Sequence, residues 1–245
     1  MFTFECLFIL IGMKRHLLLF AAAIGFASAS YGQTSYGVKA GVNLPTIKFS
    51  GPGLNHNSKS LTGFHLTGYA DIKLMTNLSI QPGLSLQNKG GKINFYDLIK
   101  SIDFTKVEGD FEIAGQDIDL ENVEGSEILK DIEPTISTMY MEVPINFVYY
   151  ISAGNGDVLL GAGPYAAYGV SARTKLQDYN ESGSFDEAGM KAFDAGLNVM
   201  AGYKLANGFL VNAGYGLGLL NTSKESDSKY SNKNRVLSFG IGYQF

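Results

Sequence analysis

The chain has 245 residues, of which 17% are charged and 12% aromatic, with 30 glycines and no tryptophan. This length suits a single all-β domain, and low charge combined with many aromatic residues argues against disorder. The formal net charge of −4 excludes the basic footprint that nucleic-acid-binding proteins carry. The single cysteine excludes a disulfide scaffold and a cysteine-based zinc site.

The N-terminal segment, residues 1–33, has the composition of an export signal. Lys14 and Arg15 precede an apolar run over residues 17–26, and the small residues 27–29 follow with an A-x-A pattern. A charged segment, a short apolar run and a small-residue cleavage site are typical of a secretory signal peptide. The apolar run is also shorter than the roughly 20 residues that a transmembrane helix needs. We therefore predict a signal peptide in this region.

The limits of this signal region are less well defined than its presence. Met13 directly precedes the charged residues and is a second candidate for the true start, and cleavage is expected between Ala29 and Gln33. One longer helix over residues 2–26, acting as an uncleaved anchor, is the alternative. The mature domain is then expected to cover residues 34–245.

Along this mature domain, large apolar residues alternate with small or polar ones. A period of two indicates a β-strand with one apolar face. The clearest example is the C-terminus, where Leu237, Phe239, Ile241, Tyr243 and Phe245 share one face. Eight segments show the pattern: 36–44, 64–74, 78–89, 139–149, 158–173, 193–203, 209–219 and 237–245.

The number and length of these segments favour a membrane barrel. Closed up-and-down barrels have an even number of strands, and about ten residues is the length that a tilted strand needs to cross a bilayer. The face with the glycines also carries Lys39, Asp71, Glu142 and Asp194. We therefore predict an all-β fold, an eight-stranded antiparallel up-and-down transmembrane β-barrel after the signal peptide. Its apolar face meets lipid and its small polar face fills a narrow lumen.

The connections between the segments give an independent indication of topology. Short connections are expected at residues 75–77, 152–157 and 204–208, and long ones at 45–63, 90–138, 174–191 and 221–234. This strict alternation is typical of outer-membrane barrels, which have short periplasmic turns and longer extracellular loops. The pattern predicts a multi-pass protein of the cell outer membrane with both termini in the periplasm.

Aromatic residues and prolines mark two further features of the strands. Outward aromatic residues at the strand ends on the periplasmic side are expected to form one interfacial girdle: Tyr36, Tyr149, Tyr203, Phe209, Tyr243 and Phe245. Proline removes a ladder hydrogen bond and belongs at edges or bulges. Pro82, Pro144 and Pro164 lie inside strands, and a line of bulges across neighbouring strands would accommodate them.

Charged residues on the lumen face are expected to form two clusters. Lys39 and Asp71 lie on adjacent strands near the same end and are predicted to pair, whereas Glu142, Arg173 and Asp194 are predicted to form a second cluster. Desolvated charges need partners, and the interior of an eight-stranded barrel is just wide enough for side chains to fill it. Salt bridges that plug and stiffen the lumen are the favoured interpretation, and a gated ion path is the alternative.

The longest predicted loop, residues 90–138, is strongly acidic. Between residues 92 and 133 it has 12 acidic and 4 basic residues, a local charge of 4 − 12 = −8. Residues 117–121 resemble the start of a calcium loop, but Asn122 and Ile128 stand where glycine and glutamate are required. Apolar residues inside the loop indicate that it folds over the barrel mouth or forms a hairpin. A solvated acidic face is the favoured interpretation of this charge, with weak binding of divalent cations as the alternative. A protein partner at residues 90–138 is a further hypothesis.

Few residues of the mature chain suit catalysis. It has two histidines, His56 and His65, and no cysteine, and Ser58 and Ser60 near His56 have no evident acid to orient a base. The glycines alternate along strands and precede no helix, so a phosphate-binding loop is not expected. We predict no catalytic residue, no cofactor and no metal, and hence no enzyme.

Five stretches resemble one known family: Tyr36–Asn43, Met141–Pro144, Gly161–Tyr165, Val199–Tyr203 and Phe239–Phe245. They are similar to the Bacteroidetes outer-membrane β-barrel family that includes PorT. The last stretch resembles the C-terminal signature by which such barrels are recognised by the barrel-insertion machinery. The resemblance implies the barrel and says little of function, although PorT itself is linked to a protein-secretion system.

The sequence thus predicts a non-enzymatic integral outer-membrane protein that is structural or partner-binding at the cell surface. Its expected partners are outer-membrane lipid, the barrel-insertion machinery through the C-terminal strand, and a protein at residues 90–138, with no nucleic acid. The alternatives are a component of a protein-secretion machine, a small ion channel and a lipid-directed membrane enzyme.

Overall fold

The structure, a computed structural model, describes residues 34–245 with several gaps. The described residues are 34–101, 112–113, 116–117, 133–176, 179–186, 188–224 and 229–245. The predicted signal peptide and most of the acidic loop therefore lie outside the described residues.

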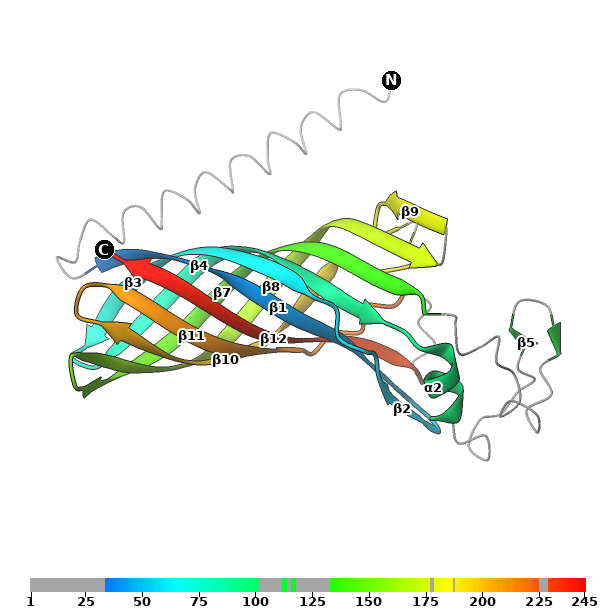
Figure 1. Cartoon of the computed structure of the whole chain (residues 1–245), viewed down its shortest axis with the longest axis horizontal. Coiled ribbons are helices and arrows are strands. Elements are labelled where there is room, and N and C mark those ends of the chain that lie inside the picture. Colours follow the sequence, from blue (N-terminus) through cyan, green and yellow to red (C-terminus); the bar gives the residue numbers. More distant parts are fainter. Residues whose placement is uncertain are drawn as a thin grey trace, which may run out of the picture.

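Eight long antiparallel strands form a closed ring (Figure 1). They are β1 (Thr34–Gly51), β3 (Gly63–Met75), β4 (Leu78–Lys92), β7 (Thr135–Ala153), β8 (Gly156–Leu176), β10 (Phe193–Leu205), β11 (Phe209–Gly218) and β12 (Ser231–Gln244). Each strand pairs with its neighbours in this order, and β12 pairs with β1 from the Gly37↔Gln244 rung to the Ser50↔Ser231 rung, which closes the ring. The predicted eight-stranded up-and-down barrel is confirmed.

Short strands and a short helix lie in the long connections at one end of the barrel. Strand β2 (Leu54–Asn57) pairs with the end of β1, and β9 (Tyr179–Gly183) pairs with the end of β8. The acidic loop contains helix α2 (Phe95–Lys100) and the strand pair β5 (Glu112–Ile113) and β6 (Gln116–Asp117). No helix in the described part of the chain is long and apolar enough to span a membrane.

The opposite end of the barrel carries the tight turns. Residues 76–77, 154–155 and 206–208 connect consecutive strands there, and the C-terminus lies at the same end (Figure 1). Gly154 and Gly208 have φ angles of 60° and 89°, a left-handed conformation that glycine adopts without steric cost. These turns agree with the three short connections expected from the sequence.

Strands β1, β7, β8 and β12 are longer than the sequence pattern indicates. They extend into segments predicted as loops, for example to Gly51 in β1 and from Thr135 in β7. In these extensions polar residues occur on both faces, so the alternation of apolar residues stops while the hydrogen-bond ladder continues. The barrel is therefore taller than its apolar face.

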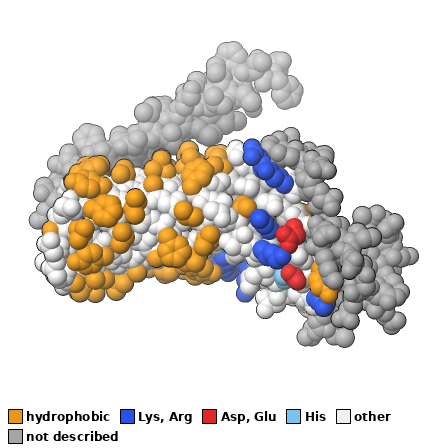
Figure 2. Space-filling view, viewed as in Figure 1, with side chains coloured by type: hydrophobic (Ala, Val, Ile, Leu, Met, Phe, Trp, Pro, Cys, Tyr) orange, Lys and Arg blue, Asp and Glu red, His pale blue; other side chains and the backbone are white. Residues whose placement is uncertain are grey.

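Burial in the barrel follows the predicted inside-out pattern. Large apolar side chains are exposed on the outer face, such as Leu66 at 55% and Ile241 at 58%, while Asn43 and Asp194 are completely buried inside. Figure 2 shows these outer side chains as a band around the barrel. An apolar outer face with a polar interior is the arrangement of transmembrane barrels.

The three strand prolines do not form the line of bulges that the sequence suggested. Beside each of Pro82, Pro144 and Pro164 two rungs of one ladder are missing, but the pairs before and after keep the same register. The register shifts lie elsewhere, at residues 73–75 of β3 and between Met139 and Tyr140 of β7. Proline thus interrupts the pairing locally, because it lacks the N–H group, without an extra residue.

One close approach between strands explains an inward glycine. Gly41 of β1 lies opposite Gly240 of β12. A Cβ atom at Gly41 would lie 2.0 Å from the carbonyl oxygen of Phe239. Gly68, on the outward face of β3, would meet nothing within 4 Å.

We therefore expect Gly41→Ala to lower the stability of the folded barrel by about 1–3 kcal/mol, the usual cost of overpacking. Gly68→Ala is the matched control, and its effect should stay within about 0.5 kcal/mol because it faces open space. A folded barrel that is not boiled runs on a gel as a compact band, faster than the unfolded chain. The measurement is the temperature at which this compact band is lost. Equal effects of the two substitutions would contradict the close approach.

Candidate functional site

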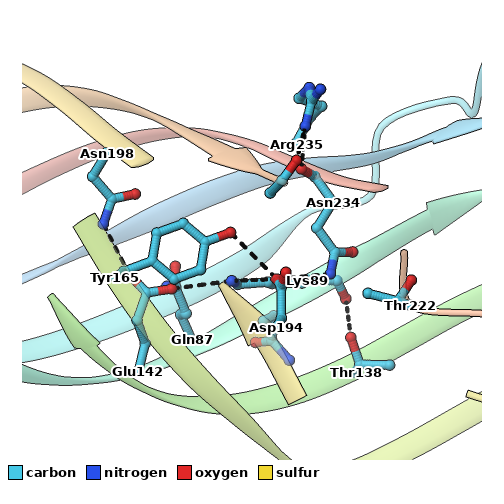
Figure 3. Close-up of polar contacts among 12 residues, drawn as sticks. Gln87, Lys89, Thr138, Glu142, Tyr165, Asp194, Asn198, Thr222, Asn234 and Arg235 are labelled. Atoms are coloured by element: carbon cyan, nitrogen blue, oxygen red, sulfur yellow. Dashed lines mark hydrogen bonds and ion pairs between the residues drawn. The ribbon is translucent and has the colours of Figure 1, made fainter. Parts of the chain in front are cut away.

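The lumen holds a buried polar cluster in the half of the barrel nearer the long loops. Inward positions of five strands contribute to it, because alternate residues of each strand point to the same face. Figure 3 shows its members: Gln87 and Lys89 of β4, Glu142 of β7, Tyr165 of β8, Asp194 and Asn198 of β10, and Asn234 of β12. We call this set the Lys89 cluster.

Lys89 lies at the centre of this cluster and is 1% exposed. Its Nζ atom lies 3.0 Å from Glu142 Oε2 and 3.0 Å from Asp194 Oδ2. The same ammonium lies 4.2 Å from the ring centroid of Tyr165 and 5.0 Å from that of Tyr140. A desolvated cation is stabilised over aromatic rings as well as by carboxylates. One lysine therefore holds β7, β8 and β10 together from β4.

Neutral side chains donate further hydrogen bonds to the two carboxylates, because a single ammonium group cannot satisfy all their oxygen atoms. Gln87 donates to Glu142 Oε2 at 2.5 Å, and Asn198 donates to Glu142 Oε1 at 3.0 Å. Asp194 Oδ2 accepts hydrogen bonds from Tyr165 at 3.3 Å and Asn234 at 3.1 Å. Hydrogen bonds to ionised groups are among the stronger ones in proteins. The cluster is thus a connected network and not an isolated ion pair.

The network continues to the first strands of the barrel. Asn43 of β1 donates to Gln87 Oε1 at 3.3 Å, and its Oδ1 atom lies 2.8 Å from His65 Nδ1 on β3. Gln87 therefore connects Asn43 to Glu142. This connected network of polar contacts includes side chains from every strand of the ring except β11.

A second buried cluster lies toward the short-turn end, and we call it the Gln81 cluster. Gln81 donates to Asp71 Oδ2 at 2.6 Å and to Tyr150 Oη at 3.0 Å, and Tyr150 also donates to Asp71. Lys39 donates to Gln81 Oε1 at 3.3 Å, and its Nζ atom lies 4.2 Å from the ring centroid of Tyr69. Here too a charged pair is completed by neutral polar and aromatic groups.

A polar cavity of about 110 Å³ has both Lys39 and Lys89 in its wall. Asn146 Oδ1 and Asn212 Oδ1 also face this region and have no hydrogen-bond partner among the described residues. A polar cavity of this size has room for ordered water. An eight-stranded barrel has an interior just wide enough for side chains to fill it, so little space is expected beyond this cavity.

Lys39 and Asp71, predicted to pair directly, are instead connected through Gln81. The amide of Gln81 accepts from Lys39 with its oxygen and donates to Asp71 with its nitrogen. The sequence pattern gave both charges the correct face. It did not reveal that the inward residue of the next strand lies between them.

Arg173 does not belong to the second predicted cluster, although Glu142 and Asp194 do lie together. The register shift opposite Met139 and Tyr140 adds one residue to β8, so Val170 and Ser171 both point outward. Beyond that bulge the strand changes phase, which buries Ala172 and exposes Arg173. The prediction for Arg173 was therefore wrong, and Lys89 provides the cation.

The sequence did contain a signal for Lys89. It follows Ser85 and Gln87 at a spacing of two on the polar face of its strand, so it had to point into the lumen with them. The registers Gln87↔Tyr140 and Ser85↔Glu142 bring this face opposite the inward face of β7. That register was not available from the alternation alone.

The predicted aromatic residues all lie on the short-turn side of the strands. Tyr36 is 48% exposed and Phe245 is 67% exposed, and their backbones hydrogen-bond to each other across the β1–β12 closure. Tyr203 donates from its hydroxyl to the carbonyl oxygen of Ala153 at 2.7 Å. Tyr149, Phe209 and Tyr243 are exposed as well.

The histidines and serines considered for catalysis have structural contacts. His65 lies in the lumen beside Asn43, and His56 of β2 stacks on Phe49 with the ring centroids 6.5 Å apart. Ser58 accepts a hydrogen bond from the backbone N–H of Ile47 and donates to the Lys59 carbonyl oxygen. Within the described ranges, no group of three or more His, Cys, Asp or Glu side chains is placed to hold a metal ion.

The acidic loop is attached to the barrel rim by a small polar clamp. Lys59 Nζ lies 2.5 Å from Glu133 Oε1, and Asn94 donates to the same oxygen at 3.0 Å. The hydrogen bond from Lys59 lowers the pKa of the Glu133 carboxyl below its ordinary value. Asn94 also caps helix α2 by accepting from the backbone N–H of Asp97. Most of the calcium-like stretch, 117–121, lies outside the described residues.

Comparison with known proteins gives one family match. The model of a family described as outer membrane protein beta-barrel domain matches residues 26–224. No curated protein matches the sequence.

Solved outer-membrane structures are similar at low identity. Ail, the attachment invasion locus protein of Yersinia pestis, is 14% identical with a TM-score of 0.41 over 86% of this chain and 98% of that chain. Neisserial surface protein A is 13% identical with a TM-score of 0.40 over 86% and 99%. OprG from Pseudomonas aeruginosa is 12% identical with a TM-score of 0.42 over 86% and 95%.

The Lys89 cluster predicts a specific pattern of stability changes. Lys89→Met leaves two buried carboxylates without their cation, so we expect a loss of about 3–5 kcal/mol. The triple variant K89M/E142Q/D194N removes all three charges and should recover most of that loss, because a neutral polar network replaces the ionic one. Arg173→Ala leaves the three buried charges paired, so it should cost much less stability than Lys89→Met.

Thermal loss of the compact gel band measures all three variants in the same detergent. A triple variant as unstable as K89M would show that lost packing, and not unpaired charge, causes the effect. An effect of R173A as large as that of K89M would contradict the assignment of Lys89, in place of Arg173, as the cation of this cluster.

Proposed function

The chain belongs to the outer membrane protein β-barrel domain family, and we propose that it is a non-enzymatic membrane barrel that offers its long-loop end to a protein partner at the cell surface. The observation that carries the proposal is the division of the barrel into a side-chain-filled lumen and a tall rim beyond the apolar band. The first argues against a pore and the second supplies a binding surface.

The proposed orientation puts the short turns and the C-terminus in the periplasm. Along β12 the outward apolar side chains run from Leu237 to Phe245, a rise of roughly 20–25 Å along the membrane normal for a strand tilted by about 40°. This fits the apolar band of outer-membrane barrels, which is about 25 Å tall. The aromatic residues at the short-turn end then form the periplasmic girdle, and the long loops face outward.

The contents of the lumen support a role without conduction. The Lys89 cluster and the Gln81 cluster lie in the interior at different heights. The Lys89 cluster connects β4 with β10 across the lumen, and the Gln81 cluster connects the neighbouring strands β1, β3, β4 and β7. Opening a continuous path would separate Lys89 from carboxylates that are themselves buried, which is costly. A small channel is therefore the weaker candidate, and it stays testable.

The height of the rim supports the partner-binding part of the proposal. Strand β8 has 21 residues, so it rises roughly 50 Å along the normal at a tilt of about 40°, against an apolar core of about 30 Å. The extra length lies at the long-loop end. The clamp between Lys59, Glu133 and Asn94 attaches the acidic loop to this raised rim, which favours the loop as the partner surface.

Two further partners follow from the same picture. The outer face meets outer-membrane lipid, and β12 with its terminal Phe245 is the segment that the barrel-insertion machinery would recognise. A component of a protein-secretion machine, the role implied by the PorT resemblance, differs in one consequence. Deleting the gene would then leave exported proteins in the periplasm, whereas a surface-binding barrel leaves export unchanged.

The orientation is tested by single cysteines in a Cys6→Ser background. Ser60 lies in a long connection and Asn155 in a short turn, and both are exposed. A membrane-impermeant maleimide applied to intact cells should label S60C and leave N155C unlabelled until the cells are lysed. The reverse labelling pattern would overturn the proposed orientation.

Conductance tests the absence of a pore. We expect purified wild-type barrel in a planar bilayer to give a flat current trace, because paired side chains fill the lumen. K89M/E142Q/D194N, which lacks the charged cluster but keeps its volume, is the matched comparison. Discrete current steps from the wild type would favour the small channel over the surface-binding role.

A further inference from the structure

The outward face of the β1–β12 pair changes from apolar to cationic within a few rungs. The rungs Val42↔Phe239 and Leu44↔Leu237 carry apolar side chains. The next outward rungs are Thr46↔Arg235 and Lys48↔Lys233. Figure 2 shows Lys and Arg side chains gathered beyond the apolar band on the side of the long loops.

The two lysines face each other without a compensating partner. Lys48 and Lys233 are directly opposite in an antiparallel pair, where Cβ atoms are about 4.5–5.5 Å apart and like charges are unfavourable. Their flanking residues in the ladders are Thr46, Ser50, Asn57, Ser231 and Arg235, none of which is acidic. Neither ammonium forms an ion pair or hydrogen bond with the part of the chain that the structure describes. Among the residues that the structure describes, this arrangement is repulsive.

Arg235 adds a third, oriented cation. Its Nη1 atom donates to the carbonyl oxygens of Gly218 at 2.5 Å and Asn234 at 3.0 Å. These bonds hold the guanidinium on the strand edge, one outward position nearer the apolar band than Lys233. Guanidinium presents five donors in a planar fork that matches phosphate oxygens. Arg235 and Lys233 thus occupy successive outward positions of β12, with Lys48 of β1 opposite Lys233.

The backbones of Lys48 and Lys233 lie just beyond the lipid headgroup layer, within reach of it for their long side chains. Lys48 and Lys233 lie four residues beyond the Leu44↔Leu237 rung, roughly 10 Å along the normal for a strand tilted by about 40°. The headgroup layer occupies about 5–8 Å beyond each side of the apolar core. A lysine side chain reaches back toward the core along apolar surface while its ammonium stays at the polar boundary.

We propose that Lys48, Lys233 and Arg235 bind the phosphate of an anionic lipid headgroup in the outer leaflet. The acyl chains of that lipid would lie along Leu44, Leu237 and Phe239 directly below. The choice of leaflet rests on the orientation proposed above, and the phosphate chemistry does not. A lipid is favoured over a soluble phosphate because the three cations adjoin the apolar band and point outward from the barrel.

The experiment measures binding of diphosphorylated lipid A to the full barrel in uncharged detergent, by native mass spectrometry and by the thermal midpoint. K48Q/K233Q should bind the lipid roughly 10- to 30-fold more weakly than wild type. K48R/K233R should retain binding. K73Q/K175Q removes one exposed lysine of β3 near the short turns and one of β8 on the other side of the ring, and should bind as wild type does.

The melting temperature without lipid is a second test, because the substitutions that weaken lipid binding should not lower stability there. In uncharged detergent alone, K48Q/K233Q should melt at or above the wild-type temperature, because a like-charge pair is removed. With the lipid present, wild type should gain stability and K48Q/K233Q should not. A K48Q/K233Q protein that forms the compact band and still binds as wild type does overturns the proposal.

Three further outcomes separate the lipid site from a soluble-phosphate site and from the proposed orientation. Inorganic phosphate that raises the wild-type midpoint as the lipid does, and competes with it, would overturn the lipid as occupant. Inverted cysteine labelling with intact lipid binding would overturn the orientation and leave the headgroup site. Correct labelling without lipid binding would overturn the site alone.

Discussion

Closure of the ladder between β1 and β12 is the constraint on which the rest of this barrel depends. A bilayer offers no water to unpaired backbone N–H and C=O groups, so an open sheet edge there is prohibitively costly. Closing eight strands fixes a narrow interior and places the C-terminus beside the first strand. The interior must then be filled by small side chains and by polar ones that satisfy each other, as Gly41, Gly240 and the Lys89 cluster do.

The Lys89 cluster shows how such a filling also specifies register. Lys89 meets Glu142 and Asp194 from a third strand, and each carboxylate receives further donors from Gln87, Asn198, Tyr165 or Asn234. A slip of one residue in any of these strands turns its side chains to the lipid face and leaves the remaining charges unpaired. Buried charge therefore contributes less to net stability than to the choice of one pairing.

Alternation alone predicted the ring of strands and the two faces, since period two and burial arise from the same backbone geometry. It did not predict Arg173, because one extra residue near Val170 reverses the phase of β8 and leaves no mark in composition. It missed Gln81 between Lys39 and Asp71, because contacts across a lumen depend on register. The strands β1 and β12 were predicted too short at the ends where polar residues occupy both faces.

The same geometry separates two kinds of lysine. Lys39 and Lys89 point inward and each lies among carboxylate, amide and aromatic groups supplied by other strands. Lys48 and Lys233 point outward at the edge of the apolar band, opposite each other, with no acidic residue in the neighbouring rungs. Within the described ranges, counter-charges thus lie beside the inward lysines and none lies in the ladders beside the outward ones. An anion held by the outward lysines would come from the bilayer itself, which makes the lipid part of the structure at that rim.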